Sequence, residues 1–130
     1  MNKLVKYLRF FFHILTLTLI IFSLYPGSIA GFIMYGDFGL QPQFGRDFFN
    51  ISSNHFYAYA TISFIGFFSY YNHRKLKLIL IYLFFLSVIL EVFHLIIPGR
   101  TFEIPDLVGN IAGVTFVGII ILIRKLWVNR

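Results

Sequence analysis

The sequence contains no cysteine and few charged residues. Without cysteine, the chain has no disulfide framework, no thiolate metal site and no cysteine nucleophile. Only 12% of its 130 residues are charged and five are acidic, whereas 58% are hydrophobic. This composition excludes an ordinary soluble domain and a disordered chain, because both carry far more polar surface.

The hydrophobic residues are collected in long runs, a pattern that predicts an all-α membrane protein. At this length, we expect a single domain over residues 1–130. The predicted architecture is a four-transmembrane-helix bundle. Its helices are expected at about residues 5–25, 54–71, 78–97 and 107–124.

The segment between the first two runs, residues 27–53, is rich in Gly, Pro, Gln and Asn. It is too long for a minimal connection between helices, and we predict a loop that folds back onto the membrane surface. A short helix lying in the membrane interface is the only regular structure that we expect there.

The first run has two interpretations. Its basic start, its apolar centre and the small residues at 28–30 resemble a signal peptide with a cleavage site. The run is nevertheless long for a signal sequence and long enough to cross a bilayer. We favour a retained helix; cleavage would leave three spans.

The charges predict an orientation. Under the positive-inside rule, three separate basic clusters and both termini would lie in the cytoplasm, as in a multi-pass protein of the bacterial cytoplasmic membrane. The net charge of +6 does not indicate nucleic acid as a partner, because these clusters adjoin apolar runs and face lipid headgroups. The clusters consist of Lys3, Lys6, Arg9, Arg74, Lys75, Lys77, Arg124, Lys125 and Arg130.

Polar residues gather where the third run ends. Glu91 and His94 are three positions apart, so on a helix they project from one face. A charge at the centre of a bilayer costs about 2.5–3.5 kcal/mol, so Glu91 needs a partner or a polar cavity. Arg100, just after the turn at Pro98 and Gly99, is the partner that we expect.

The fourth run begins with further polar candidates. Asp106 is expected to be the N-cap of this helix. Gly109 and Gly113 form a G-x-x-x-G pair, which predicts close approach of another helix, either within the chain or from a second protein. Asn110 would then donate to a neighbouring helix, with Glu91 as the expected acceptor, and His55 should lie at the same depth.

The spacing of these residues resembles the VanZ-like family of small bacterial membrane proteins. The resemblance consists of Glu91-x-x-His94-x-x-Ile97-Pro98-Gly99-Arg100, then Asp106-x-x-x-Asn110-x-x-Gly113, and His55-Phe56-x-Ala58-Tyr59 in the second run. Two positions depart from the family pattern. The family usually has Gln at position 94, and it usually has an acid at position 51, where this chain has Ile; Asp47 lies one turn earlier.

The family is named for a determinant of low-level teicoplanin resistance. The resemblance implies an envelope protein that binds an anionic lipid or a lipid-linked cell-wall precursor at the outer face, without a cofactor or a metal site. The expected ligand-binding residues are His55, Tyr59, Glu91, His94, Arg100, Asp106 and Asn110, and the expected structural residues are Pro98, Gly99, Gly109 and Gly113.

Other functions remain open at this point. An accessory subunit could dock on another membrane protein, or on a second copy, through the Gly109/Gly113 face. A metal-dependent hydrolase could use N and O ligands from His55, Glu91, His94 and Asp106, although no established metal-binding spacing is present. The two outer histidines could also ligate a pigment such as haem.

Overall fold

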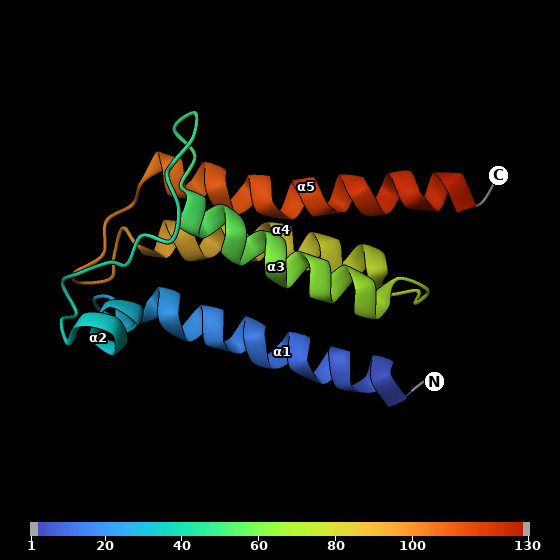
Figure 1. Ribbon diagram of the computed structural model, residues 1–130, viewed down its shortest axis with the longest axis horizontal. Coiled ribbons are helices and arrows are strands. Elements are labelled where there is room, and N and C mark those ends of the chain that lie inside the picture. The colour runs from blue at the N-terminus through green and yellow to red at the C-terminus, as the bar shows by residue number, and fades with distance from the viewer. Residues whose placement is uncertain (1–2, 129–130) are drawn as a thin grey trace.

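The computed structural model describes residues 3–128, and within that range the chain is all-helical. The four long helices run side by side, and both described ends lie at the same end of the bundle (Figure 1). The short helix α2 and the longer loops lie at the opposite end. The helices are α1 (Lys3–Leu24), α2 (Ile29–Tyr35), α3 (Ser53–Tyr70), α4 (Leu76–Phe93) and α5 (Ile104–Val128).

Three of these helices, α1, α4 and α5, are long and apolar enough to cross a membrane. Their outward faces are rich in large apolar side chains; on α1, for example, Phe10, Leu17 and Ile21 are at least half exposed. Apolar side chains in such numbers are suited to contact with lipid chains. The molecule therefore has the composition of a membrane protein.

The helix α3 falls outside this group because its composition is more polar. It lies against α1, α4 and α5, and its buried side chains include Ser53, Ser63 and Ser69. A helix shielded by three neighbours contacts less lipid, so it needs fewer apolar residues than a helix at the edge of the bundle. The helix expected at 54–71 is thus present as α3, and it lies among three other helices and has a more polar composition than they do.

The closest helix contact joins α3 and α5 through the predicted glycine pair. A Cβ atom at Gly109 would lie 2.7 Å from the Ser52 carbonyl oxygen, and one at Gly113 would lie 2.6 Å from the Phe56 carbonyl oxygen. The G-x-x-x-G face is therefore filled by α3 of the same chain. The alternative in which this face receives a partner protein is wrong for this structure, because α3 leaves it no room.

Several helix ends differ from the sequence prediction. The helix α4 ends at Phe93 rather than near residue 97, and His94 is its C-cap. Residues 95–97 continue as turns, and Gly99 then reverses the chain with φ of +73°, a conformation that favours glycine. The helix α5 starts at Ile104 and ends at Val128, longer at both ends than expected.

The short helix allowed by the sequence within residues 27–53 is α2. Its N-cap, Ser28, accepts a hydrogen bond from the Gly31 amide at 2.9 Å, and Gly36 ends it with φ of +73°. A Cβ at Gly31 would collide with the Leu40 carbonyl group, so the following loop packs directly on α2. This contact folds residues 27–53 over one end of the bundle.

The α3–α5 contact predicts a difference between two glycines of the same helix. Gly113→Ala should destabilise the protein by about 1–3 kcal/mol, because the new methyl group meets backbone atoms that cannot rotate away. Gly118→Ala is the control, since its Cβ would lie 3.4 Å from a flexible Leu80 methyl group. Thermal unfolding in detergent measures both; equal melting temperatures for the two variants would contradict the packing described.

Candidate functional site

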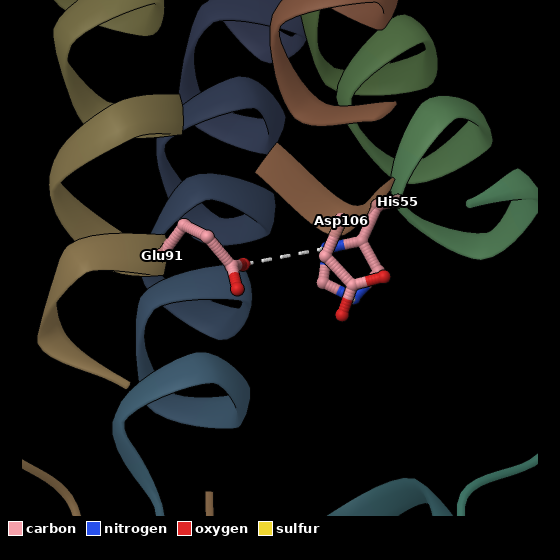
Figure 2. Close-up of side chains that lie close together, drawn as sticks. All are labelled: His55, Glu91 and Asp106. Atoms are coloured by element: carbon pink, nitrogen blue, oxygen red, sulfur yellow. Dashed lines mark ion pairs between the residues drawn. The ribbon is translucent and has the colours of Figure 1, made fainter. Parts of the chain in front are cut away.

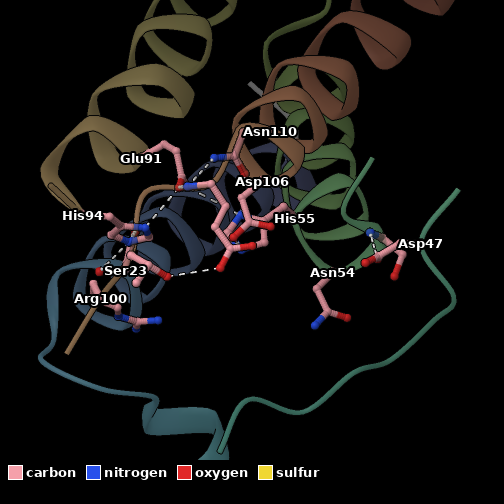
Figure 3. Close-up of polar contacts among 12 residues, drawn as sticks. Ser23, Asp47, Asn54, His55, Glu91, His94, Arg100, Asp106 and Asn110 are labelled. Atoms are coloured by element: carbon pink, nitrogen blue, oxygen red, sulfur yellow. Dashed lines mark hydrogen bonds and ion pairs between the residues drawn. The ribbon is translucent and has the colours of Figure 1, made fainter. Parts of the chain in front are cut away.

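The predicted polar residues gather at the end of the bundle that carries α2 and the long loops (Figure 3). His55 is in the first turn of α3 and Glu91 is in the last turn of α4. Asp106 is in the first turn of α5, and Asn110 lies one turn further along. Residues distant in sequence thus meet because three helices begin or end at the same level.

Glu91 is the centre of this group and is only 1% exposed. Its Oε2 accepts from Asn110 Nδ2 at 3.4 Å, and its Oε1 accepts from the Glu103 backbone amide at 3.2 Å. His94 Nδ1 lies 3.3 Å from Oε1, and His55 Nδ1 lies 4.0 Å from Oε2. The predicted Asn110–Glu91 contact is confirmed, and the carboxylate joins α3, α4, α5 and the α4–α5 loop.

Asn110 is 1% exposed and is held in one orientation. Its Nδ2 donates to the Ser87 carbonyl oxygen at 3.2 Å, an atom that can only accept. The amide oxygen therefore faces His55, and Oδ1 lies 2.8 Å from His55 Nδ1. His55 must carry a hydrogen on Nδ1 to make this contact favourable.

The second nitrogen of His55 faces Asp106. Nε2 lies 3.3 Å from Asp106 Oδ2, and each side chain is 18% exposed. Figure 2 shows His55, Glu91 and Asp106 pointing toward one another from three helices. The prediction of Asp106 as an N-cap is wrong, because α5 starts at Ile104 and places Asp106 within the first turn, directed at α3.

Arg100 does not form the expected ion pair with Glu91. Its Nε donates to the Tyr25 carbonyl oxygen at 3.1 Å, and its Nη2 donates to the Phe22 carbonyl oxygen. The last carbonyl groups of a helix have no N–H donor within the helix. Here the planar guanidinium of Arg100 donates to two carbonyl groups at the end of α1. Burial lowers the pKa of Arg100, while the charges of Glu91 and Asp106 oppose that shift.

His94 connects α4 to α1 and is buried. Its Nε2 lies 3.1 Å from the Ser23 carbonyl oxygen and 3.3 Å from Ser23 Oγ, while Nδ1 faces Glu91. Ser23 was not among the predicted site residues, because a serine near the end of an apolar run gives no signal of its own. Together with Arg100, His94 fixes the end of α1 against the α4–α5 loop.

Two adjoining cavities lie among these residues. The larger, of about 160 Å³, has apolar walls from α1, α2 and α3, and it is also lined by His55, Tyr59 and Asn110. The smaller, of about 80 Å³, has a mostly polar lining that includes Asp106 and Glu103. The residues that line both cavities are Ser28, Gln41, His94 and Arg100. A polar compartment thus adjoins an apolar one, with Arg100 at the junction.

Asp47 does not join this group. Its Oδ1 accepts from the Ser53 amide at 2.9 Å, at the start of α3, and from Gln43 Nε2 at 2.9 Å. The backbone donor lowers the pKa of Asp47, which is an exposed side chain. Asp47 therefore stabilises the start of α3, and the acid that the VanZ-like pattern has at position 51 has no substitute in it.

Position 94 offers a test of the network. His94→Gln should retain most of the stability, because an amide can donate to Glu91 and Ser23. His94→Leu should cost about 1–3 kcal/mol, because it removes the donors and leaves buried acceptors unpaired. Thermal unfolding compares the two variants, with Asn72→Leu at an exposed position of the α3–α4 turn as the control. Wild-type stability of His94→Leu would contradict the role assigned to His94.

The chain was compared with protein-family models, curated proteins and solved structures. No family model, curated protein or solved structure matches this chain. The VanZ-like resemblance therefore depends on the spacing of the residues from Glu91 to Gly113 and from His55 to Tyr59 alone.

Proposed function

We propose that this protein binds an anionic amphiphile at the outer end of a four-span helix bundle in the bacterial cytoplasmic membrane. The observation that carries this proposal is the pair of adjoining cavities, one with apolar walls and one polar, with Arg100 lining both. An amphiphile has the same division between an apolar chain and a polar headgroup. Ligand sites of this kind combine apolar walls with a few placed polar groups.

The apolar compartment suits a hydrocarbon chain. Its walls include Leu19 and Phe22 of α1, Ile29 of α2, and Ala58 of α3. These residues lie near the predicted membrane surface, where a lipid chain can enter from the bilayer without crossing water. Burying each CH₂ group contributes about 0.8 kcal/mol, so a few buried groups supply substantial affinity.

The polar compartment suits an anionic headgroup. A guanidinium carries five N–H donors, and among residues 3–128 Arg100 gives two of them to carbonyl groups at the end of α1, those of Phe22 and Tyr25. The remaining donors can hold phosphate or carboxylate, for which the planar fork has matching geometry. Arg100 would therefore hold α1 and the ligand together.

The proposed topology has α3 as the fourth span. The basic residues of α1, of the α3–α4 turn and of the end of α5 belong to one end of the bundle, and the polar site belongs to the other (Figure 1). The positive-inside rule then directs the basic end to the cytoplasm and the site to the outer leaflet. The VanZ-like resemblance adds a candidate ligand class at that leaflet, a lipid-linked cell-wall precursor.

Ligand binding can be measured by native mass spectrometry from mild detergent, with phosphatidylglycerol and polyprenyl phosphate as probes and diacylglycerol as the uncharged comparison. We expect wild-type protein to retain an anionic probe. Arg100→Ala should weaken binding about tenfold or more, because a charged hydrogen bond contributes about 1.5–3 kcal/mol. Ala58→Phe should weaken it by filling the apolar compartment.

Two controls separate ligand contact from general damage. Arg46→Ala removes an exposed arginine of the same loop-bearing end, and Val92→Leu enlarges an exposed apolar residue of α4. Both should bind as wild type does. The proposal is wrong if Arg100→Ala and Ala58→Phe both retain wild-type affinity, or if diacylglycerol binds as tightly as the anionic probes.

The topology is tested by labelling, and the cysteine-free chain makes single-cysteine variants direct to interpret. In intact cells, a membrane-impermeant maleimide should label Asp37→Cys and Thr101→Cys, both exposed positions at the site end. Asn72→Cys, in the α3–α4 turn, should react only after permeabilisation. Labelling of Asp37→Cys and Asn72→Cys from the same side would show that α3 does not span.

A further inference from the structure

Three side chains that can ligate a metal, those of His55, Glu91 and Asp106, converge from three different helices at the loop-bearing end of the bundle. One ligand atom from each of His55, Glu91 and Asp106 can be chosen so that all lie within 4.8 Å of one another (Figure 2). Because the set joins an imidazole to two carboxylates, it offers both N and O ligands. The helix backbones hold the three positions, so the cluster does not depend on a mobile loop.

The hydrogen-bonding groups around His55 are all acceptors. Nδ1 faces Asn110 Oδ1 at 2.8 Å and Glu91 Oε2 at 4.0 Å, and Nε2 faces Asp106 Oδ2 at 3.3 Å. The orientation of Asn110 is fixed independently, because its Nδ2 donates to the Ser87 carbonyl oxygen. The cluster is therefore rich in lone pairs and short of positive charge, which is the electrostatic condition that a bound cation satisfies.

The nearby cations are committed elsewhere. Arg100 donates to the carbonyl groups of Phe22 in α1 and of Tyr25 just after it, and His94 lies between Glu91 Oε1 and Ser23. Asp106 is left with His55 as its charged neighbour within 4 Å among residues 3–128. The carboxylates of Glu91 and Asp106 thus have few positively charged neighbours. A divalent ion bound between them would neutralise both.

The cluster also has space for the remaining ligands of an ion. His55 and Asn110 line the 160 Å³ cavity, and Asp106 lines the 80 Å³ cavity. Water molecules in these cavities could complete the coordination sphere, and the ion could enter from the polar compartment. The Asn110 carbonyl oxygen, held toward His55, is a further oxygen at the edge of the site.

We propose that His55, Glu91 and Asp106 bind one divalent first-row transition-metal ion, for which Zn²⁺ is the probe. Imidazole and carboxylate are established Zn²⁺ ligands, and ligand atoms of a tetrahedral Zn²⁺ ion lie roughly 3.4 Å apart. The observed separations of 3.3 and 4.0 Å are near this value, although they involve different nitrogens of His55. One nitrogen ligates at a time, so binding requires a small side-chain rotation.

The expected site had no metal, and the alternative hydrolase used four ligands, His55, Glu91, His94 and Asp106; the proposed metal site uses three of these. His94 is outside the converging group, because its ring lies between Glu91 and α1. The site that we propose therefore has three protein side chains and open positions. It requires no lipid, so its test is independent of the amphiphile proposal.

The test uses full-length protein in detergent that has been stripped with a chelator and then dialysed against Zn²⁺ alone. Elemental analysis should find one Zn²⁺ per chain. Asp106→Asn and His55→Gln should each weaken binding at least tenfold, in line with the loss of a ligand. Matched controls are Asp37→Asn, an exposed acid of the same end, and His73→Gln at the opposite end; both should bind as wild type does.

A second readout guards against variants that fail to fold. Co²⁺ replacing Zn²⁺ should give a visible absorption band in wild type and in Asp37→Asn, and that band should be absent in Asp106→Asn at unchanged elution volume. Asp106→Asn keeps side-chain size at a partly exposed position, so its folding should be preserved. The proposal is overturned if wild type binds no Zn²⁺, or if both cluster variants bind the ion as tightly as wild type does.

Discussion

The buried carboxylate of Glu91 needs partners that replace water, and the arrangement of the helices depends on these partners. A charged group removed from water is costly unless hydrogen bonds and opposite charge replace the solvent. Glu91 obtains these from Asn110 of α5, from the Glu103 amide in the α4–α5 loop, and from His94. Because the partners come from separate segments, satisfying Glu91 fixes the relative positions of α4, α5 and their connecting loop.

The other polar contacts extend this arrangement to the remaining helices. His55 brings α3 into the network through Asn110, and Arg100 and His94 hold the end of α1 through its carbonyl groups. At the opposite end the contacts are largely apolar, with Phe12 and Phe67 in the core. The polar end contains cavities lined by hydrogen-bonding side chains of the network. Ligand binding is proposed at these cavities, where the buried polar groups gather.

Much of this could be predicted from the sequence, because long apolar runs and i to i+3 or i+4 spacings are local signals. The glycine pair followed from such a spacing, and the Asn110–Glu91 contact followed from the helix packing that this pair predicts. The hydrogen bonds from Arg100 to the carbonyl groups at the end of α1 could not be predicted, because they depend on where α1 ends relative to the α4–α5 loop. The end of α4 was hidden by the apolar residues at 95–97, which continue the pattern without continuing the helix. Whether α3 spans a membrane also depends on its neighbours.

The central claim is that Glu91 and Asn110 stabilise the fold jointly, and a double-mutant cycle measures this most directly. Unfolding free energies would be compared for wild type, Glu91→Leu, Asn110→Leu and the double variant. If the two residues act through the contact described, the effects should be non-additive, with a coupling energy of about 0.5–3 kcal/mol. Additivity to within about 0.5 kcal/mol would contradict the account, because the residues would then be energetically independent.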